Sequence, residues 1–301
     1  MILRPPREDE FGDLLELMNA HQLAAFGEAD LTAEELRLWL TAPSVDVERD
    51  LRVIEDDCRL VGYADVDPNS DEPPLWWCDV KVAPDADADA VLSELVAWLD
   101  RRAEAGTLRV WTGANDARVV GVLERLGFEP LRHSYRMEIG LDGDPRPPVW
   151  PAGMTVRTAS ADDHRLVYET VVEVWQDTSD PWDESFDEWK HWAVDAPAYD
   201  PSLWFLAFAG GELAGFSLCR QDPTNPNAGY VATLGVRRPW RRRGLGEALL
   251  LHSFDAFKAR GYTRATLGVD ASSPTGATRL YERAGMRVYR TTVFLQRPVR
   301  G

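Results

Sequence analysis

A basic, glycine-containing stretch near residue 240 carries the residues best suited to hold an anion. An apolar run, Tyr230 to Val236, precedes it, and a periodic apolar stretch that predicts an amphipathic helix follows it. The first backbone N–H groups of such a helix lack intrahelical partners and favour anions, helped by the helix dipole. Glycines leave room for a phosphate, and arginines add positive charge, at Arg237, Arg238, Arg241, Arg242, Arg243, Gly244 and Gly246. The spacing therefore predicts a phosphate site between a strand and a helix.

The loop differs from the common nucleotide-binding loops. It lacks the Gly-Lys-Ser/Thr ending of a P-loop and the Gly-x-Gly-x-x-Gly of a dinucleotide fold. A second motif lies further along the chain, after a strand-like run over residues 265–270. There Ser273 and Pro274 predict a helix cap followed by a first-turn proline, and Gly285 predicts the end of that helix.

Together the two motifs resemble the acyl-CoA site of the GNAT N-acetyltransferase superfamily. The loop pattern of that family is Gln/Arg-x-x-Gly-x-Gly/Ala, and its later helix resembles Asn-x-x-Ala-x-x-Leu-Tyr-x-x-x-Gly-Phe. This chain keeps the four positions Ala277, Leu280, Tyr281 and Gly285. It departs from the pattern with Ser273 in place of the asparagine and Met286 in place of the phenylalanine. The first departure would remove a side-chain amide contact to the cofactor.

The resemblance implies acetyl-CoA as co-substrate, no metal, and direct attack by a neutral amine. The pantetheine arm would pair with the strand at Leu234–Val236, where a backbone N–H could also hold the developing oxyanion. The implied cofactor-binding residues are Leu234, Gly235, Val236, Arg241, Arg242, Arg243, Gly244, Leu245, Gly246, Glu247, Ser273, Thr275, Gly276, Ala277 and Tyr281.

Tyr281 is the implied catalytic residue. It would protonate the departing thiolate, since the ordinary pKa of a tyrosine, about 10, is close to that of a thiol. The alternative is an aromatic core residue next to Leu280. No carboxylate lies on the strand before the loop, so the general base stays open between Asp222, in the preceding loop, and a chain of ordered water.

An internal repeat predicts two domains. Strand, helix, hairpin, helix and final helix motifs recur in the same order in both halves of the chain, as in Leu123–Phe128 and Tyr281–Met286. A proline-rich segment over residues 142–153 separates the copies and predicts a stiff linker. We therefore expect α/β domains at 1–141 and 154–301, each a GNAT-like, mostly antiparallel mixed sheet flanked by helices, with activity in the second.

The first copy has acidic residues where the second has its basic loop. Asp85, Asp87 and Asp89 replace arginines, and both glycines are absent. Like charges about 4 Å apart cost roughly 1 kcal/mol in water and about 4 kcal/mol near a protein surface. We therefore expect the first domain to be degenerate, without acyl-CoA binding at this loop.

The acceptor region is expected at the start of the second domain, where carboxylates and tryptophans are interleaved. Such a pocket would suit a cationic amine through ion pairs and cation–π contacts. The expected substrate-binding residues are Trp175, Asp177, Trp182 and Glu184. The alternative is a solvated acidic face with its tryptophans packed in the core.

Composition limits the partners of this 301-residue chain. Its net charge of −17 argues against nucleic acid and anionic membranes, and makes the local arginine cluster more informative. No apolar run approaches the roughly 18–20 residues that span a bilayer, and no signal-peptide core is present. The three cysteines lack C-x-x-C spacing, so no metal site is predicted. We expect a cytoplasmic protein, and the sequence leaves its oligomeric state unknown.

The function predicted is transfer of an acetyl group to a primary amine of a small molecule. The tandem layout with an active second copy is similar to that of the mycothiol synthase family, although amines of aminosugars or aminoglycoside-like compounds fit the sequence as well. The alternative is a non-catalytic acyl-CoA-binding or regulatory module, which would keep the loop and lose turnover. A third reading, nucleic-acid binding through the arginines, requires a broad basic face, which the net charge disfavours.

Overall fold

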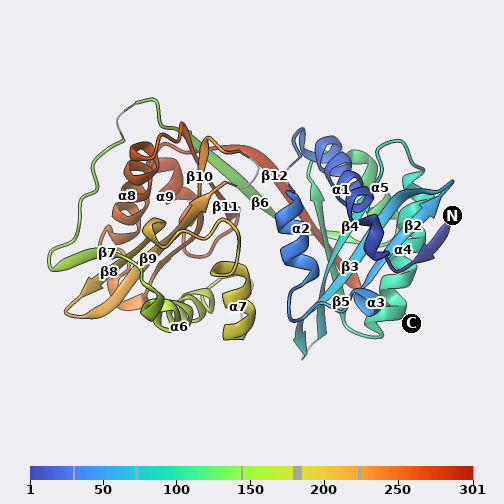
Figure 1. Cartoon of the computed structure of the whole chain (residues 1–301), viewed down its shortest axis with the longest axis horizontal. Helices are drawn as coiled ribbons and strands as arrows, with labels where there is room; N and C mark the ends of the chain where they lie inside the picture. The colour runs from blue at the N-terminus through green and yellow to red at the C-terminus, as the bar shows by residue number, and fades with distance from the viewer. Residues whose placement is uncertain (30, 72–73, 144, 179–184, 223–224, 301) are drawn as a thin grey trace. The chain divides into compact units, whose positions relative to one another are not determined.

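The protein is described here from a computed structural model, which covers residues 1–29, 31–71, 74–143, 145–178, 185–222 and 225–300. Two compact units divide the chain, one formed by residues 1–134 with 290–301, and one by residues 135–289. Each contains a mixed sheet with helices packed on it (Figure 1). None of the helices within these described ranges is long and apolar enough to cross a membrane.

The first unit is built on six strands in the order β1-β2-β3-β4-β5-β12. All pairings are antiparallel except β4 with β5. Its elements are β1 (Ile2–Arg4), α1 (Phe11–Phe26), α2 (Ala33–Leu40), α3 (Val47–Asp50), β2 (Leu51–Asp56), β3 (Arg59–Asp71), β4 (Pro74–Val82), α4 (Ala88–Ala103), β5 (Thr107–Gly113), α5 (Ala117–Arg125) and the beginning of β6 (Glu129–Gly140), with most of β12 (Arg287–Pro298).

The second unit has the strand order β6-β11-β10-β9-β8-β7. Here β10 and β11 form the parallel pair, and β7 to β10 are antiparallel. Its elements are the end of β6, then β7 (Met154–Thr158), α6 (His164–Trp175), α7 (Phe186–Ala193), β8 (Trp204–Ala209), β9 (Glu212–Gln221), β10 (Ala228–Val236), α8 (Leu245–Ala259), β11 (Arg264–Asp270) and α9 (Ala277–Arg283). The structure thus confirms the predicted fold class, mixed sheets flanked by helices.

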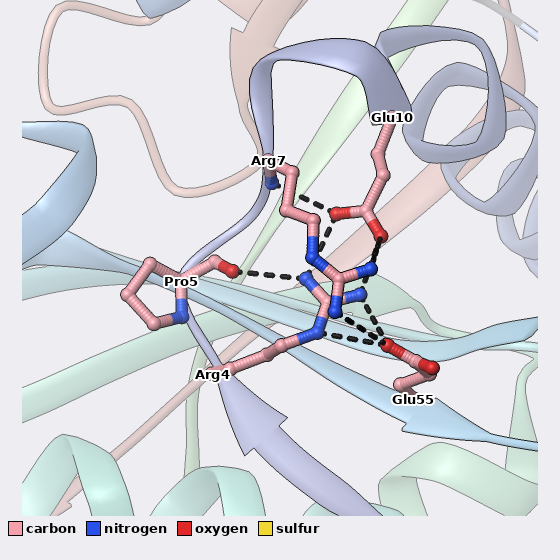
Figure 2. Close-up of polar contacts among 5 residues, drawn as sticks. All are labelled: Arg4, Pro5, Arg7, Glu10 and Glu55. Carbon is pink, nitrogen blue, oxygen red and sulfur yellow. Dashed lines mark hydrogen bonds and ion pairs between the residues drawn. The ribbon is translucent and has the colours of Figure 1, made fainter. Parts of the chain in front are cut away.

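The repeat extends to the contacts that start each unit. Arg4 at the end of β1 donates to Glu10 and Glu55, which ties the strand to the following helix and to β2 (Figure 2). In the second unit Arg157 at the same place in β7 donates to Asp163 at 2.6 and 2.7 Å. Both arginines fix the turn from the first strand into the first helix.

The compact units differ from the predicted linear boundaries at two strands. Residues 292–298 of β12 pair antiparallel with β5 in the first unit, with Phe294 opposite Trp111. Residues 135–140 of β6 belong to the second unit, where the Leu141 N–H donates to Thr263 O at 2.8 Å. A linear boundary fails because the strand that completes each sheet comes from the other half of the sequence.

The sheet of the second unit is covered on both faces. Phe254 and Phe257 of α8 are fully buried with Val231 and Leu267 on one face. Val171 of α6 packs with a second cluster on the other, where α7 also lies (Figure 1). Because both faces are filled, the loop between β10 and α8 has a fixed position at the end of the sheet.

Candidate functional site

One cavity of about 510 Å³ collects most of the predicted cofactor residues of the second unit. It brings together the end of β10, the loop after it, the start of α8 and the start of α9. Its lining includes the predicted residues Leu234, Val236, Arg241, Arg242, Gly244, Leu245, Gly246, Glu247, Thr275, Gly276, Ala277 and Tyr281. Gly235, Arg243 and Ser273 are not among its lining residues. The volume lies in the range of small-molecule and cofactor sites.

The loop before α8 depends on left-handed backbone. Gly244 has φ +85° and stands at the N-cap of α8, where a side chain would be strained even though the space around it is open. Arg242 also has positive φ, at 58°. A Cβ on Gly246 would come within 3.3 Å of Leu280 Cδ1, because α8 and α9 approach closely there. The first residues of α8 line the cavity, and the first N–H groups of a helix lack intrahelical partners.

Asp177, which is predicted as an acceptor residue, lies against the basic loop and lines the cavity. Its carboxylate accepts from Arg238 Nε at 3.0 Å and pairs with Arg241 Nη1 at 2.7 Å. Hydrogen bonds from Arg238 and Arg241 lower the pKa of Asp177 to about 2, so it is ionised at neutral pH. Arg241 Nε also donates to Val236 O at 2.8 Å. Asp177 therefore holds the loop in position.

The other predicted acceptor residues are only partly placed. Trp175 is half-buried at the end of α6 and packs against the core cluster on that face. Trp182 and Glu184 lie outside the described residues. The described part of this region therefore does not test the predicted carboxylate and indole pocket, and the acceptor residues stay a prediction.

β10 loses its parallel partner before it reaches the loop. Its parallel register with β11 ends at Val231, opposite Leu267. Its antiparallel register with β9 continues to Val236, with a shift between Val231 and Thr233. Within the described strands, the second edge of residues 232–236 is therefore left for another extended segment. An arm such as pantetheine can pair there as an added strand.

Tyr281 is at the inner wall of the cavity. It lies in α9 and is 7% exposed. Burial, with a further contribution from Tyr230, raises the pKa of Tyr281 to about 12. The phenol is therefore protonated at neutral pH and has a proton to give, but its raised pKa makes it a weaker acid than an ordinary tyrosine toward a thiolate, whose conjugate thiol has a pKa of about 8.5.

The second motif folds differently from the predicted cap. α9 begins at Ala277, with Gly276 at its N-cap and φ +75°, and not after Ser273. The Ser273 hydroxyl instead contacts the Thr275 hydroxyl at 2.9 Å, and Ser273 O accepts from Gly276 N–H at 3.0 Å. Residues 273–276 thus form a tight turn before the helix. Gly276 closes this turn with left-handed backbone, so the helix begins only after it. Gly285, at φ +97°, follows the end of α9 as predicted.

The carboxylates near the cavity are engaged. Among the lining residues Asp177 is bound by arginines, and Glu247 pairs with Arg146 at 3.1 Å. Asp222, one of the two options for a base, is 3% exposed and accepts from Thr266 Oγ1 at 2.9 Å. The lining also includes Val174, which lies outside both motifs, and Trp240, which lies within the basic loop; the motif reasoning named neither as a site residue.

The equivalent region of the first unit is arranged differently. Asp85 pairs with Arg59 at 2.8 Å, Asp87 caps α4, and Asp89 pairs with Arg125 at 2.6 Å. The three carboxylates are thus bound to the frame of their own unit.

The strand edge of the first unit is also occupied. Val82, at the end of β4, donates its N–H to His21 Nδ1 at 3.2 Å. Its carbonyl accepts from Arg118 Nη2 at 3.4 Å. Burial and the nearby Lys81 lower the pKa of His21 to about 3, so the imidazole is neutral and can accept this bond.

The family model and the similar proteins both identify acetyltransferases. The model of the acetyltransferase (GNAT) family matches residues 168–286. The chain is 31% identical to a mycothiol acetyltransferase from Streptomyces scabiei over 242 residues, covering 77% of this chain and 74% of that protein. It is 29% identical to a mycothiol acetyltransferase from Acidothermus cellulolyticus over 264 residues, covering 82% of this chain and 79% of that protein.

Solved structures agree with this match. The crystal structure of a GCN5-related N-acetyltransferase from Sphaerobacter thermophilus superposes with a TM-score of 0.79 at 31% identity, covering 100% of this chain and 96% of that one. A tandem GNAT protein from the clavulanic acid biosynthesis pathway also gives a TM-score of 0.79, at 18% identity, covering 100% and 99%. The latter likeness concerns the fold alone.

Proposed function

Because the chain belongs to the GNAT acetyltransferase family, we propose that the cavity of its second unit transfers an acetyl group from acetyl-CoA to the primary amine of a small molecule. The observation that carries this proposal is the meeting of three features in one cavity. They are the start of α8 with its basic loop, the free edge of β10 and the phenol of Tyr281. A phosphate site, a strand edge for pantetheine and a proton donor are what thioester aminolysis by acetyl-CoA requires.

In this proposal the pyrophosphate is held by the loop and the first turn of α8. Arg242 is exposed, does not share the ion pair of Arg241 with Asp177, and supplies positive charge to the pyrophosphate. Arg241 holds the conformation of the loop through its ion pair with Asp177. A backbone N–H of β10 stabilises the oxyanion as the amine attacks the thioester carbon. The carbon–sulfur bond then breaks, and Tyr281 protonates the leaving thiolate.

Direct attack is favoured over an acyl-enzyme. The lining of the cavity includes no cysteine among the described residues. Cys219 is buried, and burial raises the pKa of its thiol to about 11, which disfavours the nucleophilic thiolate. The amine must then be neutral when it attacks, and we propose that it loses its proton to solvent or through ordered water.

We propose that the acceptor is an amine of the kind that the mycothiol acetyltransferases act on, because two relatives that bear this name cover most of the chain. The test is a screen of acetyl transfer over small amines, aminosugars, peptides and the amine precursor of mycothiol, with free CoA as the readout. Turnover with one class of small amine supports the proposal. Tight acetyl-CoA binding without turnover on any amine would favour the alternative, a non-catalytic acyl-CoA-binding module.

A further inference from the structure

One arginine ties the proline-rich segment between the two copies of the repeat to the cavity of the second unit. Arg146 Nη2 donates to Glu247 Oε1 at 3.1 Å and to Arg283 O at 2.7 Å. Glu247 lies in the first turn of α8, and Arg283 is the last residue of α9. Because Glu247 and Arg283 both line the cavity, Arg146 joins two of its walls from a segment outside both motifs.

Further contacts hold this segment on α8. Lys258 Nζ, in the last turn of the helix, donates to Gly143 O at 2.9 Å. The ring of Trp150 meets that of His252 edge to face, with the centroids 5.6 Å apart. Prolines directly precede and follow Arg146, and they restrict the backbone there. Arg146 is therefore presented to the start of α8 by a segment with little conformational freedom.

The carboxylate of Glu247 is an unfavourable neighbour for a phosphate. A carboxylate in the first turn of a helix is attracted by the positive end of the helix dipole, and a phosphate binds at the same place for the same reason. Two anions at one helix start repel each other. The ion pair with Arg146 reduces this conflict, because it neutralises Glu247 and engages its carboxylate.

In the first unit, the carboxylate at the start of the corresponding helix binds an arginine of the last helix. Asp89 of α4 pairs with Arg125 Nη2 of α5 at 2.6 Å. The repeat matches residues 123–128 with 281–286, so Arg125 corresponds to Arg283 of α9. In the second unit Arg146 binds the helix-start carboxylate instead. Arg283 has no carboxylate partner among the residues that the structure describes, and it lines the cavity.

We propose that Arg146 is a positioning residue for acetyl-CoA, which neutralises Glu247 and so leaves Arg283 open to the phosphates of the cofactor. This inference rests on the proposed function, because it requires acetyl-CoA in the cavity. It extends the cofactor site to the segment between the two copies and adds Arg283 to the phosphate-binding groups of the basic loop. Arg146 does not touch the reacting atoms, so it should act on cofactor affinity.

The experiment measures acetyl-CoA binding to the full-length protein by calorimetry. We expect Arg146→Gln to raise the dissociation constant by about threefold to tenfold, because Glu247 then repels the phosphates and is available to Arg283. The Arg146 side chain is 59% exposed, so the variant is expected to fold. Adding Glu247→Gln to this variant should return the constant to within about twofold of the original, because the repelling charge is gone. Arg283→Gln alone should raise the constant by about threefold.

Arg260→Gln is the matched control. It removes one positive charge from an exposed arginine at the other end of α8 that does not line the cavity, and it should leave the dissociation constant unchanged. Equal losses in Arg146→Gln and in the double variant would mean that Arg146 acts only through its bond to Arg283 O, and would overturn the proposal. An unchanged constant in Arg146→Gln or in Arg283→Gln overturns it as well, while the proposed function stands. Absence of acetyl-CoA binding to the original protein would refute the proposed function and this inference with it.

Discussion

Replacing Tyr281 by phenylalanine tests the proposed proton donor most directly. The change removes one oxygen from a side chain that is 7% exposed, and among the described residues the phenol makes no hydrogen bond that would be lost. We therefore expect the free energy of unfolding to change by less than about 1 kcal/mol. Acetyl-CoA affinity should also be retained, since the loop and the strand edge are untouched.

The expected loss is in turnover. A positioned general acid contributes about 10²- to 10⁴-fold, or roughly 2.7–5.5 kcal/mol of barrier. We expect kcat of Tyr281→Phe to fall by about 10²-fold, with the dissociation constant of acetyl-CoA within about twofold of the original. Thiol release during steady-state turnover gives kcat, and calorimetry gives the affinity. Tyr262→Phe is the matched control, a tyrosine of the same unit that does not line the cavity.

Two outcomes would refute this reasoning. Turnover of Tyr281→Phe close to that of the original protein would mean that solvent protonates the thiolate. A parallel loss of acetyl-CoA affinity and kcat would mean that Tyr281 shapes the cavity and has no role in proton transfer.

Further predictions concern the loop, the silent copy and the base. Asp177→Asn should raise the KM for acetyl-CoA severalfold, because Arg238 and Arg241 lose their anchor, and spare the KM of the amine; the reverse pattern in initial-rate kinetics would restore Asp177 to the acceptor site. Gly244→Ala should weaken acetyl-CoA binding by about tenfold in calorimetry, since a left-handed backbone costs an alanine about 1–2 kcal/mol, and an unchanged affinity would argue against a fixed loop. Changing Asp85, Asp87 and Asp89 together to alanine should leave acetyl-CoA affinity nearly unchanged, and a large loss would place a cofactor site in the first unit. With the pKa of Tyr281 raised to about 12, the phenol stays protonated below pH 11, so kcat/KM should rise with pH to a plateau set by the pKa of the amine. An inflection at one pH for amines of different pKa would instead reveal a base on the enzyme.

Hairpins and helix starts were predicted well, because residues close together in the sequence determine them. The hairpin of β8 and β9 turns at Gly210 and Gly211, and α8 begins directly after Gly244, as the turn residues and the apolar period indicate. The predicted helix cap at Ser273 was wrong, because Gly276 adopts left-handed backbone and the helix begins only after it. A serine followed by a proline is compatible both with a helix cap and with a tight turn. Local chemistry alone did not decide between the two.

Long-range partners could not be predicted from the same patterns. Asp177 and Arg238 are 61 residues apart in the sequence, so their ion pair could not be predicted from a local pattern. A carboxylate near tryptophans predicts a cation site, but the pattern does not say whether the cation belongs to a ligand or to the chain itself. β12 has the sequence of an ordinary strand, and nothing in its pattern says which unit it completes. A repeat of sequence motifs gives the order of the elements, but strand exchange is decided by pairing energies between distant segments.

The proposed lack of acyl-CoA binding in the first unit has two separate causes, and they differ in how easily mutation could remove them. Loop charge is the first, and it involves exposed aspartates that mutation can remove. The second is the strand edge, where the N–H and carbonyl groups of Val82 are already bonded to His21 and Arg118. A pantetheine arm would have to displace both partners and leave a buried imidazole without its bond, which costs about 1–3 kcal/mol. We therefore infer that a basic glycine loop alone, transplanted into the first unit, would not create an acyl-CoA site, because the edge that receives the cofactor is built into the core around α1.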